Sequence, residues 1–140
     1  MILQHTPTPY PPRKATSGSA CWDLASPCSG TVHPGSQRTF DLGYSVAVPE
    51  GYALMIYSRS GHGVNAGVTL ANCVGVIDSD YRGNLMVTLR AAEDGPGLVV
   101  RPGDRIAQAM LTPVPQATLE CVDTLPPTER GVGGHGSTGA

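Results

Sequence analysis

Apolar and polar residues alternate over most of the chain between about residues 20 and 122. The alternation is clearest at 40–48 and 85–90, and a period of two is typical of β-strands with one buried face. The inward positions of these two stretches would be Phe40, Leu42, Val46, Val48, Leu85, Val87 and Leu89. Residues 54–57 are apolar at every position and predict a strand buried on both faces, and the apolar run at 106–111 predicts another strand.

No window of a dozen residues shows a helical period, and at most residues 60–67 form a short helix. Turn residues at 49–51 and 101–104 separate the apolar runs. Many short strands joined by tight turns predict an all-β subunit, a sandwich or barrel of jelly-roll type. The 18 glycines, 13 prolines and 5% aromatic residues agree with that prediction.

The two ends of the chain depart from the pattern. Residues 1–14 carry four prolines and predict an extended arm along a surface or a partner chain. Residues 123–129 break the alternation, and the glycine-rich stretch 130–140 lacks the apolar surface to fold alone. We therefore expect a β domain over 1–122, and a linker with a mobile flap over 123–140 that orders over a ligand.

Charge and cysteine content exclude several classes. A net charge of −2 gives no general attraction to nucleic acid or to an anionic membrane. All nine basic residues except Lys14 are arginine, which suits phosphate or carboxylate binding, although codon bias would give the same composition. Cys21, Cys28, Cys73 and Cys121 lack metal-ligand spacing and indicate free thiols. Without a leader-like or membrane-spanning apolar run, we expect a soluble, cytoplasmic protein.

The segment GVIDSDYRG at 75–83 places two acids, a tyrosine and an arginine between apolar strands, as at a hairpin tip. By itself it is ambiguous, because Asp80 and Arg82 could form a weak surface ion pair in a solvated turn. Four further segments accompany it in order. The set is SACWDL at 19–24, SRSG at 58–61, DSDYRG at 78–83, GDRIAQ at 103–108 and RGVGGHGSTG at 130–139.

These five segments resemble, in order and spacing, the five motifs of the trimeric dUTPase family, the deoxyuridine triphosphate nucleotidohydrolases. The resemblance runs from about residue 13 to 139. It implies a jelly-roll subunit in a homotrimer, with each active site drawing on all three chains. The implied reaction converts dUTP and water to dUMP and pyrophosphate, with Mg²⁺ held mainly by the triphosphate.

The resemblance also implies catalytic roles. Asp78 matches the carboxylate that orients and deprotonates the attacking water, although an aspartate there could also only cap a turn. Gln108 matches the residue that steadies the α-phosphate and that water. Asp23 matches an acid that reaches Mg²⁺ through a water molecule and is not a direct ligand.

Substrate-binding roles follow in the same way. Tyr81 matches the tyrosine whose ring lies against deoxyribose and excludes a 2′-hydroxyl, and its alternative role is hairpin packing. Asn72 matches the residue that binds the uracil edge, or it is an ordinary strand-entry asparagine. Main-chain groups near Val76, Ile77 and Met86 would complete the base site. The phosphate chain would be held by Arg59, Ser60 and Gly61.

The tail would close the site. Arg130 would pair with the γ-phosphate, and His135 would cover the uracil where the family usually has phenylalanine. The phosphate cradle would be formed by Gly136, Ser137 and Thr138. Two other positions depart from the family, since Ser58 replaces a usual proline and His62 replaces a usual aliphatic residue and is expected at a surface or interface.

Two alternatives stay open. A dCTP deaminase would share this fold, but the resemblance to that family implies a glutamate after the third motif, and residues 87–90 contain none. A non-catalytic jelly-roll binding or regulatory protein would have no need for Asp78, Tyr81 and Gln108 together with the complete tail. Asp104 and Arg105 are expected to be structural, and no pattern indicates a further regulatory protein partner.

Overall fold

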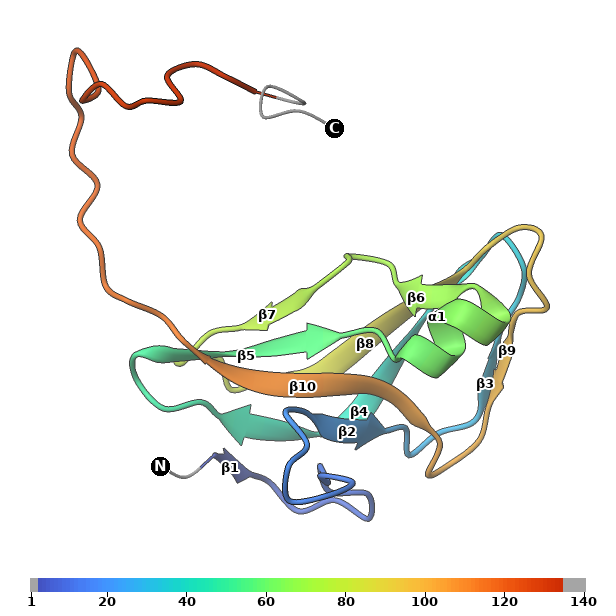
Figure 1. Ribbon diagram of the computed structural model, residues 1–140. Helices are drawn as coiled ribbons and strands as arrows, with labels where there is room; N and C mark the ends of the chain where they lie inside the picture. The colour runs from blue at the N-terminus through green and yellow to red at the C-terminus, as the bar shows by residue number, and fades with distance from the viewer. Residues whose placement is uncertain (1–2, 135–140) are drawn as a thin grey trace.

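The computed structural model describes residues 3–134. The strands are β1 (Gln4–His5), β2 (Trp22–Ala25), β3 (Gly30–Val32), β4 (Gln37–Ala47), β5 (Tyr52–Tyr57), β6 (Val68–Leu70), β7 (Gly75–Ile77), β8 (Asn84–Ala91), β9 (Leu98–Val100) and β10 (Arg105–Pro113). They form two four-stranded antiparallel sheets, in the orders β1-β4-β8-β6 and β2-β10-β5-β7, and a small β3-β9 pair (Figure 1). This is the expected all-β sandwich of jelly-roll type.

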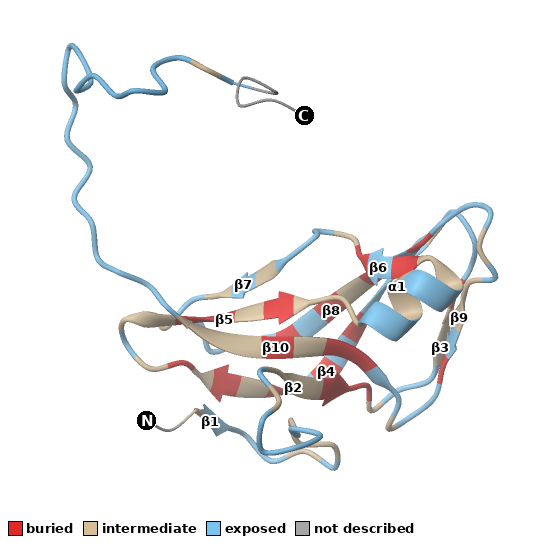
Figure 2. Ribbon diagram, viewed as in Figure 1, coloured by how far each residue is buried: buried red, intermediate tan, exposed pale blue. Residues whose placement is uncertain are grey.

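The core lies between the two sheets and follows the alternation in the sequence (Figure 2). On β4 every second residue from Phe40 to Val46 is buried, and the same holds for β8 from Leu85 to Ala91. The facing sheet contributes Leu24, Leu54, Ile56, Ile106 and Ala109. All the inward positions predicted from the sequence are buried, because burial of a large aliphatic side chain is worth about 1.5–3 kcal/mol.

Strand β5 is less covered than its composition predicts. Leu54 and Ile56 are buried in the core, whereas Met55 and Tyr57 on the outward face are only half-buried in the single chain. The strand is central in its sheet, between β10 and β7. Its outward apolar face therefore has room for more contacts than one chain supplies.

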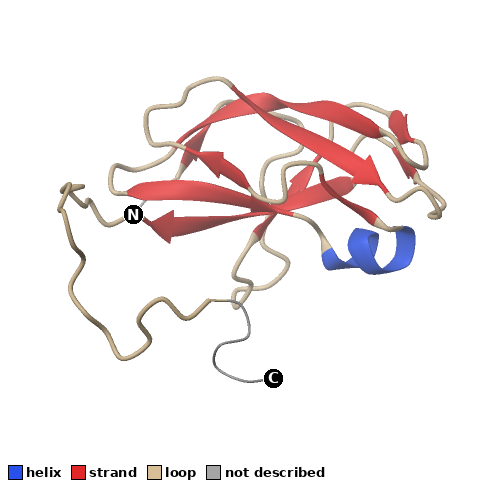
Figure 3. Ribbon diagram, turned by 90° about the horizontal axis from the view of Figure 1, so that it is seen from above, coloured by secondary structure: helices blue, strands red, loops and turns tan. Residues whose placement is uncertain are grey.

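The expected short helix is α1, Ser60–Ala66, at one edge of the sandwich (Figure 3). It ends at Gly67, whose φ of 61° is left-handed and whose N–H donates to the carbonyl of Gly63 at 3.1 Å. In the described residues, no helix combines the length and the apolar character needed to cross a membrane.

The N-terminal arm runs along its own sandwich. Strand β1 pairs with β4, and further on Arg13 forms an antiparallel bridge with Asp23. The Arg13 N–H donates to the Asp23 carbonyl at 3.2 Å, and the Asp23 N–H donates back at 2.8 Å. The arm thus follows a surface of its own chain and covers one side of β2.

Residues 114–134, the C-terminal segment, leave the sandwich after β10 (Figure 1). The N–H of Val114 still donates to the carbonyl of Gly51 at 2.8 Å. Further along, Leu119 is 99% exposed and Leu125 is 79% exposed. This segment therefore presents apolar side chains that its own domain does not cover.

Candidate active site

Asp23 on β2 lies at the centre of a group of charged side chains. Its Oδ1 accepts a hydrogen bond from Arg59 Nε at 3.1 Å, and its Oδ2 accepts one from Arg105 Nη1 at 3.1 Å. The side chains of Asp23 and Arg59 are only 18% and 24% exposed. We call Asp23, Arg59, Arg105 and Gln108 the Asp23 cluster.

Strand pairing explains why these residues meet. Strand β10 lies between β2 and β5, and its Gln108 is in register with Asp23 on one side and Tyr57 on the other. Arg59 is the second residue after β5 and also donates from Nη1 to the Arg105 carbonyl at 3.0 Å. The cluster is therefore preformed by three neighbouring strands and fixes the direction of the Arg59 side chain.

Ser58 and Gln108 tie the end of β5 to this cluster. Gln108 Nε2 donates to the carbonyl of Ser58 at 2.9 Å, and the Ser58 hydroxyl accepts the N–H of Leu70 at 2.8 Å. A proline at position 58 could not accept that bond. Ser58 therefore links the end of β5 to β6 through a hydrogen bond that a proline would lack.

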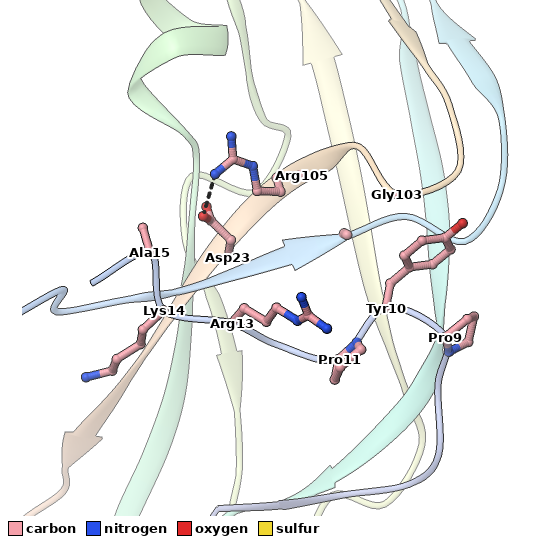
Figure 4. A pocket seen from close by; sticks show the side chains of 10 residues that line it. Pro9, Tyr10, Pro11, Arg13, Lys14, Ala15, Asp23, Gly103 and Arg105 are labelled. Carbon is pink, nitrogen blue, oxygen red and sulfur yellow. Dashed lines mark hydrogen bonds and ion pairs between the residues drawn. The ribbon is translucent and has the colours of Figure 1, made fainter. Parts of the chain in front are cut away.

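Arg105 is expected from the sequence to be structural, and the structure pairs it directly with Asp23 (Figure 4). This ion pair is compatible with that expectation, and it adds to the Asp23 cluster a residue that the sequence did not place there. A hollow of about 500 Å³ lies beside this pair, lined by the N-terminal arm with Tyr10, Arg13 and Lys14. The Lys14 side chain points away from the pair and lies 4.8 Å from the ring centroid of Trp22. The signal that could have found Arg105 is the antiparallel pairing of its strand with that of Asp23.

The first turn of α1 lies next to the Asp23 cluster. Ser60 and Gly61 follow Arg59 directly and are exposed. His62 is half-buried, and its Nδ1 is buried without a hydrogen-bond partner in the described structure. Burial and the positive charges of Arg59 and Arg105 lower the pKa of His62, so its imidazole is neutral near pH 7.

A second part of the predicted site is a slot between β7 and the facing strands β6 and β8. Its volume is about 130 Å³, and it is lined by Ile56, Leu70, Asn72, Gly75, Val76, Ile77, Met86 and Thr88. Strand β7 is one of the two edge strands of its sheet. An edge strand has main-chain N–H and C=O groups free to bind a flat polar ligand.

Asp78 and Tyr81 lie in the turn after β7. Asp78 is exposed, and its carbonyl accepts the Tyr81 N–H at 3.3 Å. The Tyr81 hydroxyl donates to the carbonyl of Asn84 at 3.0 Å, and the residue is 41% exposed. Arg82 binds the carbonyls of Ser79 and Tyr81 at 2.7 and 2.8 Å, so it stabilises the turn from within.

The two parts of the site are separated within one chain. Strands β10 and β7 lie on opposite sides of β5, and Gln108 on β10 is in register with Tyr57 whereas Ile77 on β7 is in register with Leu54. Gln108 and Ile77 are therefore separated by three residues along the strand direction and by two strand spacings across the sheet. Standard strand dimensions place the Cα atoms of Gln108 and Ile77 roughly 14 Å apart, and Asp78 is one residue further. Side chains that hydrogen-bond one water molecule must end within about 6 Å of each other. Asp78 and Gln108 of one chain therefore cannot hold the same water.

The tail residues are the third part of the predicted site. Arg130 lies in the exposed C-terminal segment, and its Nε donates to the carbonyl of Gly133 at 2.9 Å. His135, Gly136, Ser137 and Thr138 lie outside the described residues.

Asp23 is the residue that the resemblance assigns to Mg²⁺ through a water molecule. In the described part of the chain no three His, Cys, Asp or Glu side chains are grouped as a metal site. Both oxygens of Asp23 already accept hydrogen bonds from arginines, and each retains one further lone pair. Each oxygen of Asp23 can therefore accept one further hydrogen bond.

Comparisons with known proteins agree with one family. The dUTPase family model matches residues 9–139. The deoxyuridine 5′-triphosphate nucleotidohydrolase of Leifsonia xyli subsp. xyli is 40% identical over 91% of this chain and 84% of its own length. The protein of the same name from Ralstonia nicotianae is 43% identical over 91% of this chain and 88% of its own.

Solved structures show the same fold. The dUTPase of Staphylococcus bacteriophage 80alpha with dUPNHPP has a TM-score of 0.87 at 23% identity and covers 99% of both chains. A mutant dUTPase from phage phi11 of S. aureus, described with a structural Mg(II) ion, has a TM-score of 0.78 at 20% identity and covers 89% of this chain and 98% of its own. The family match spans all three parts of the site and both sheets of the sandwich, and this chain belongs to the dUTPase family.

Proposed function

We propose that this protein hydrolyses dUTP to dUMP and pyrophosphate, which limits uracil incorporation into DNA and supplies dUMP for dTMP synthesis. One observation carries the proposal: Asp23, Arg59 and Gln108 meet on neighbouring strands, beside the exposed Ser60 and Gly61. Guanidinium, hydroxyl and main-chain donors in one place suit a chain of phosphates. Family membership identifies the nucleotide class.

The base and sugar would bind at the slot beside β7. Main-chain groups near Val76, Ile77 and Met86, with the side chain of Asn72, would bind the uracil edge. Cytosine has its donor and acceptor exchanged there, and the thymine methyl would need extra room. The Tyr81 ring would lie against the deoxyribose, where a 2′-hydroxyl collides with it.

Asp78 would act as the general base. It would accept a proton from water as the water oxygen attacks the α-phosphorus. The bond from that phosphorus to the bridging oxygen breaks, and its electron pair leaves with pyrophosphate. Gln108 would hold the α-phosphate and the water, and Ser60 would stabilise the charge that grows on the bridging oxygen.

The phosphate chain would lie along Arg59, Ser60 and Gly61. Bound Mg²⁺ would neutralise part of the triphosphate charge, and Asp23 would contact it through a water molecule. Because both oxygens of Asp23 are held by arginines, its carboxylate is oriented before substrate arrives.

We further propose a homotrimer with shared sites. The separation of Asp78 from Gln108 within one chain supports it, because a complete site then needs the turn of one subunit and the Asp23 cluster of another. The C-terminal segment supports it too, since its exposed leucines need a surface to cover them. Arg130 would reach the γ-phosphate, His135 would cover the base, and residues 136–138 would cradle phosphates. We place this activity in the cytoplasm.

Separate incubation with dUTP, dCTP, dTTP and UTP, followed by chromatography of the products, tests the proposal. We expect dUMP and pyrophosphate from dUTP, with the other nucleotides largely intact. Release of ammonia from dCTP would identify a deaminase. Recovery of all four nucleotides intact in the presence of Mg²⁺ would identify a non-catalytic binding protein.

A further inference from the structure

We propose that Asp41 and Asn84 position Tyr81 and thereby set the preference for deoxyribose over ribose. This inference rests on the proposed function, in which the Tyr81 ring lies against the sugar. Asp41 belongs to β4, a strand that carries none of the five motif segments. Asn84 is the first residue of β8, directly after the hairpin turn.

The Asn84 side chain is held entirely by β4. Its Nδ2 donates to both Oδ1 and Oδ2 of Asp41 at 3.1 Å, and its Oδ1 accepts the Ser45 hydroxyl at 3.2 Å. Asp41 Oδ1 also accepts the N–H of Gly43 at 2.8 Å. Every polar group of the Asn84 side chain therefore has a partner on the neighbouring strand, so the residue has little freedom to move.

The main chain of Asn84 holds Tyr81. Its carbonyl accepts the tyrosine hydroxyl at 3.0 Å, which fixes the far end of the side chain. The near end is fixed by the turn, through the Tyr81 N–H and the Asp78 carbonyl. Gly83 leaves space for the ring, because a Cβ there would lie 2.6 Å from Tyr81 Cζ. The ring is thus anchored at both ends across the base of the hairpin.

The Asp41 carboxylate positions Asn84, whose carbonyl binds the Tyr81 hydroxyl. Between Asp41 and Ser45 the register of β4 against β8 shifts, and Gly43 inside the shift has a φ of 73°. The Asp41 carboxylate spans the irregularity, since it binds Gly43 on its own strand and Asn84 on the next. The position of the Asn84 carbonyl relative to the sheet therefore depends on this carboxylate.

Movement of the Tyr81 ring is expected to change the selectivity for dUTP over UTP more than the turnover of dUTP. A 2′-hydroxyl adds one oxygen atom at the sugar, so its exclusion requires the ring to stay in place within a fraction of an ångström. A ring that moves aside admits ribose, whereas dUTP loses little by the same movement. Loss of the Asp41–Asn84 contact is expected to raise UTP hydrolysis relative to dUTP hydrolysis.

The variant Asn84→Asp tests this on the full-length protein. It puts two carboxylates face to face and removes the Nδ2 donors, while the main-chain carbonyl that binds Tyr81 stays. We expect the ratio of kcat/KM for dUTP to that for UTP to fall about fivefold or more, as loss of one net hydrogen bond implies. Adding Asp41→Asn reverses the hydrogen bond, because the new amide at position 41 can donate to the new carboxylate at position 84. The double variant should therefore recover most of the wild-type dUTP-to-UTP ratio of kcat/KM.

Ser36→Ala is the matched control, because it removes a side-chain hydrogen bond to the His33 carbonyl just before the same strand. Its ratio should equal that of the wild type. An unchanged ratio in Asn84→Asp, or no recovery in the double variant, would overturn the inference. If Asn84→Asp does not fold, Tyr81→Phe removes the hydroxyl that Asn84 binds, and an unchanged ratio there would also overturn it. Wild-type protein that leaves dUTP intact would instead refute the proposed function, and this inference with it.

Discussion

The Asp23 cluster and the C-terminal segment are both assigned to the phosphates, yet the chain holds them in opposite ways. Asp23 and Arg59 are mostly buried, and each is fixed by hydrogen bonds to side chains or main chain of neighbouring strands. Leu119 and Leu125 in the C-terminal segment are exposed. The Asp23 cluster is therefore ordered before substrate binds, whereas the C-terminal segment needs a substrate or another subunit to become ordered.

Because of this difference, substitutions in the two regions should differ in whether they lower the stability of the fold as well as the activity. Groups in the Asp23 cluster contribute to the fold as well as to the site, so their loss should affect both. Groups on exposed segments contribute little to the fold, so their loss should affect activity alone. The exposed turn that carries Asp78 resembles the C-terminal segment in this respect, although it is anchored at both ends.

The largest effect is expected for Asp78→Asn. Turnover of dUTP should fall by about three orders of magnitude, because the base is lost while the shape of the side chain remains. The melting temperature should stay within about 2 °C of the wild type, since an exposed substitution usually changes stability by less than 0.5 kcal/mol. Steady-state kinetics and thermal melts measure the two effects. Near-normal turnover would show that another group is the base.

Deletion of residues 130–140 should lower kcat/KM by about two orders of magnitude without changing the melting temperature. The reason is that the tail is proposed to contact bound substrate, whereas its described residues, 130–134, are not part of the hydrophobic core. Mixed with Asp78→Asn chains and reassembled, the truncated chains should regain part of the activity, because Asp78 and a tail would then come from different subunits. Mixed oligomers without any recovery would contradict shared sites.

Asp23→Asn should affect both properties. An amide facing the Arg59 and Arg105 guanidinium groups places donors against donors, so we expect a loss of about 1–2 kcal/mol in the free energy of unfolding. We also expect roughly tenfold lower kcat/KM, because Arg59 loses its orientation. Asp123→Asn in the C-terminal segment is the matched control and should change neither quantity. A loss of activity without any loss of stability would remove the distinction between the two regions.

The smallest effect concerns pH and His62. Its pKa is lowered in the folded state, so as pH falls below the ordinary value of about 6.5 the unfolded chain takes up a proton more readily. Stability is therefore lost on the acid side. The drop in melting temperature from pH 7.5 to 5.5 should be smaller in His62→Gln than in the wild type, and the exposed His33→Gln serves as the control. Equal drops in all three proteins would mean that His62 titrates normally.

The sequence by itself determined the long strands β4 and β8 and their inward faces. Alternation at 40–48 and 85–90 predicted the buried residues of β4 and β8, because side chains point to opposite faces at a fixed period. The short helix and the turn at 101–104 were also local, the latter closed by the Asp104 carboxylate on the Arg101 N–H at 2.7 Å. The resemblance to the dUTPase family assigned Asp23, Arg59 and Gln108 to the site, and the structure brings the three residues together.

Only the tertiary structure decided which other residues join them. Arg105 meets Asp23 because β10 pairs with β2, and Asn84 meets Asp41 because β8 pairs with β4 across a register shift. No local sequence pattern predicts either contact, since the partners are far apart in sequence. Which side chains face one another depends on strand order and register, and these are set by the packing of the whole core rather than by any one segment.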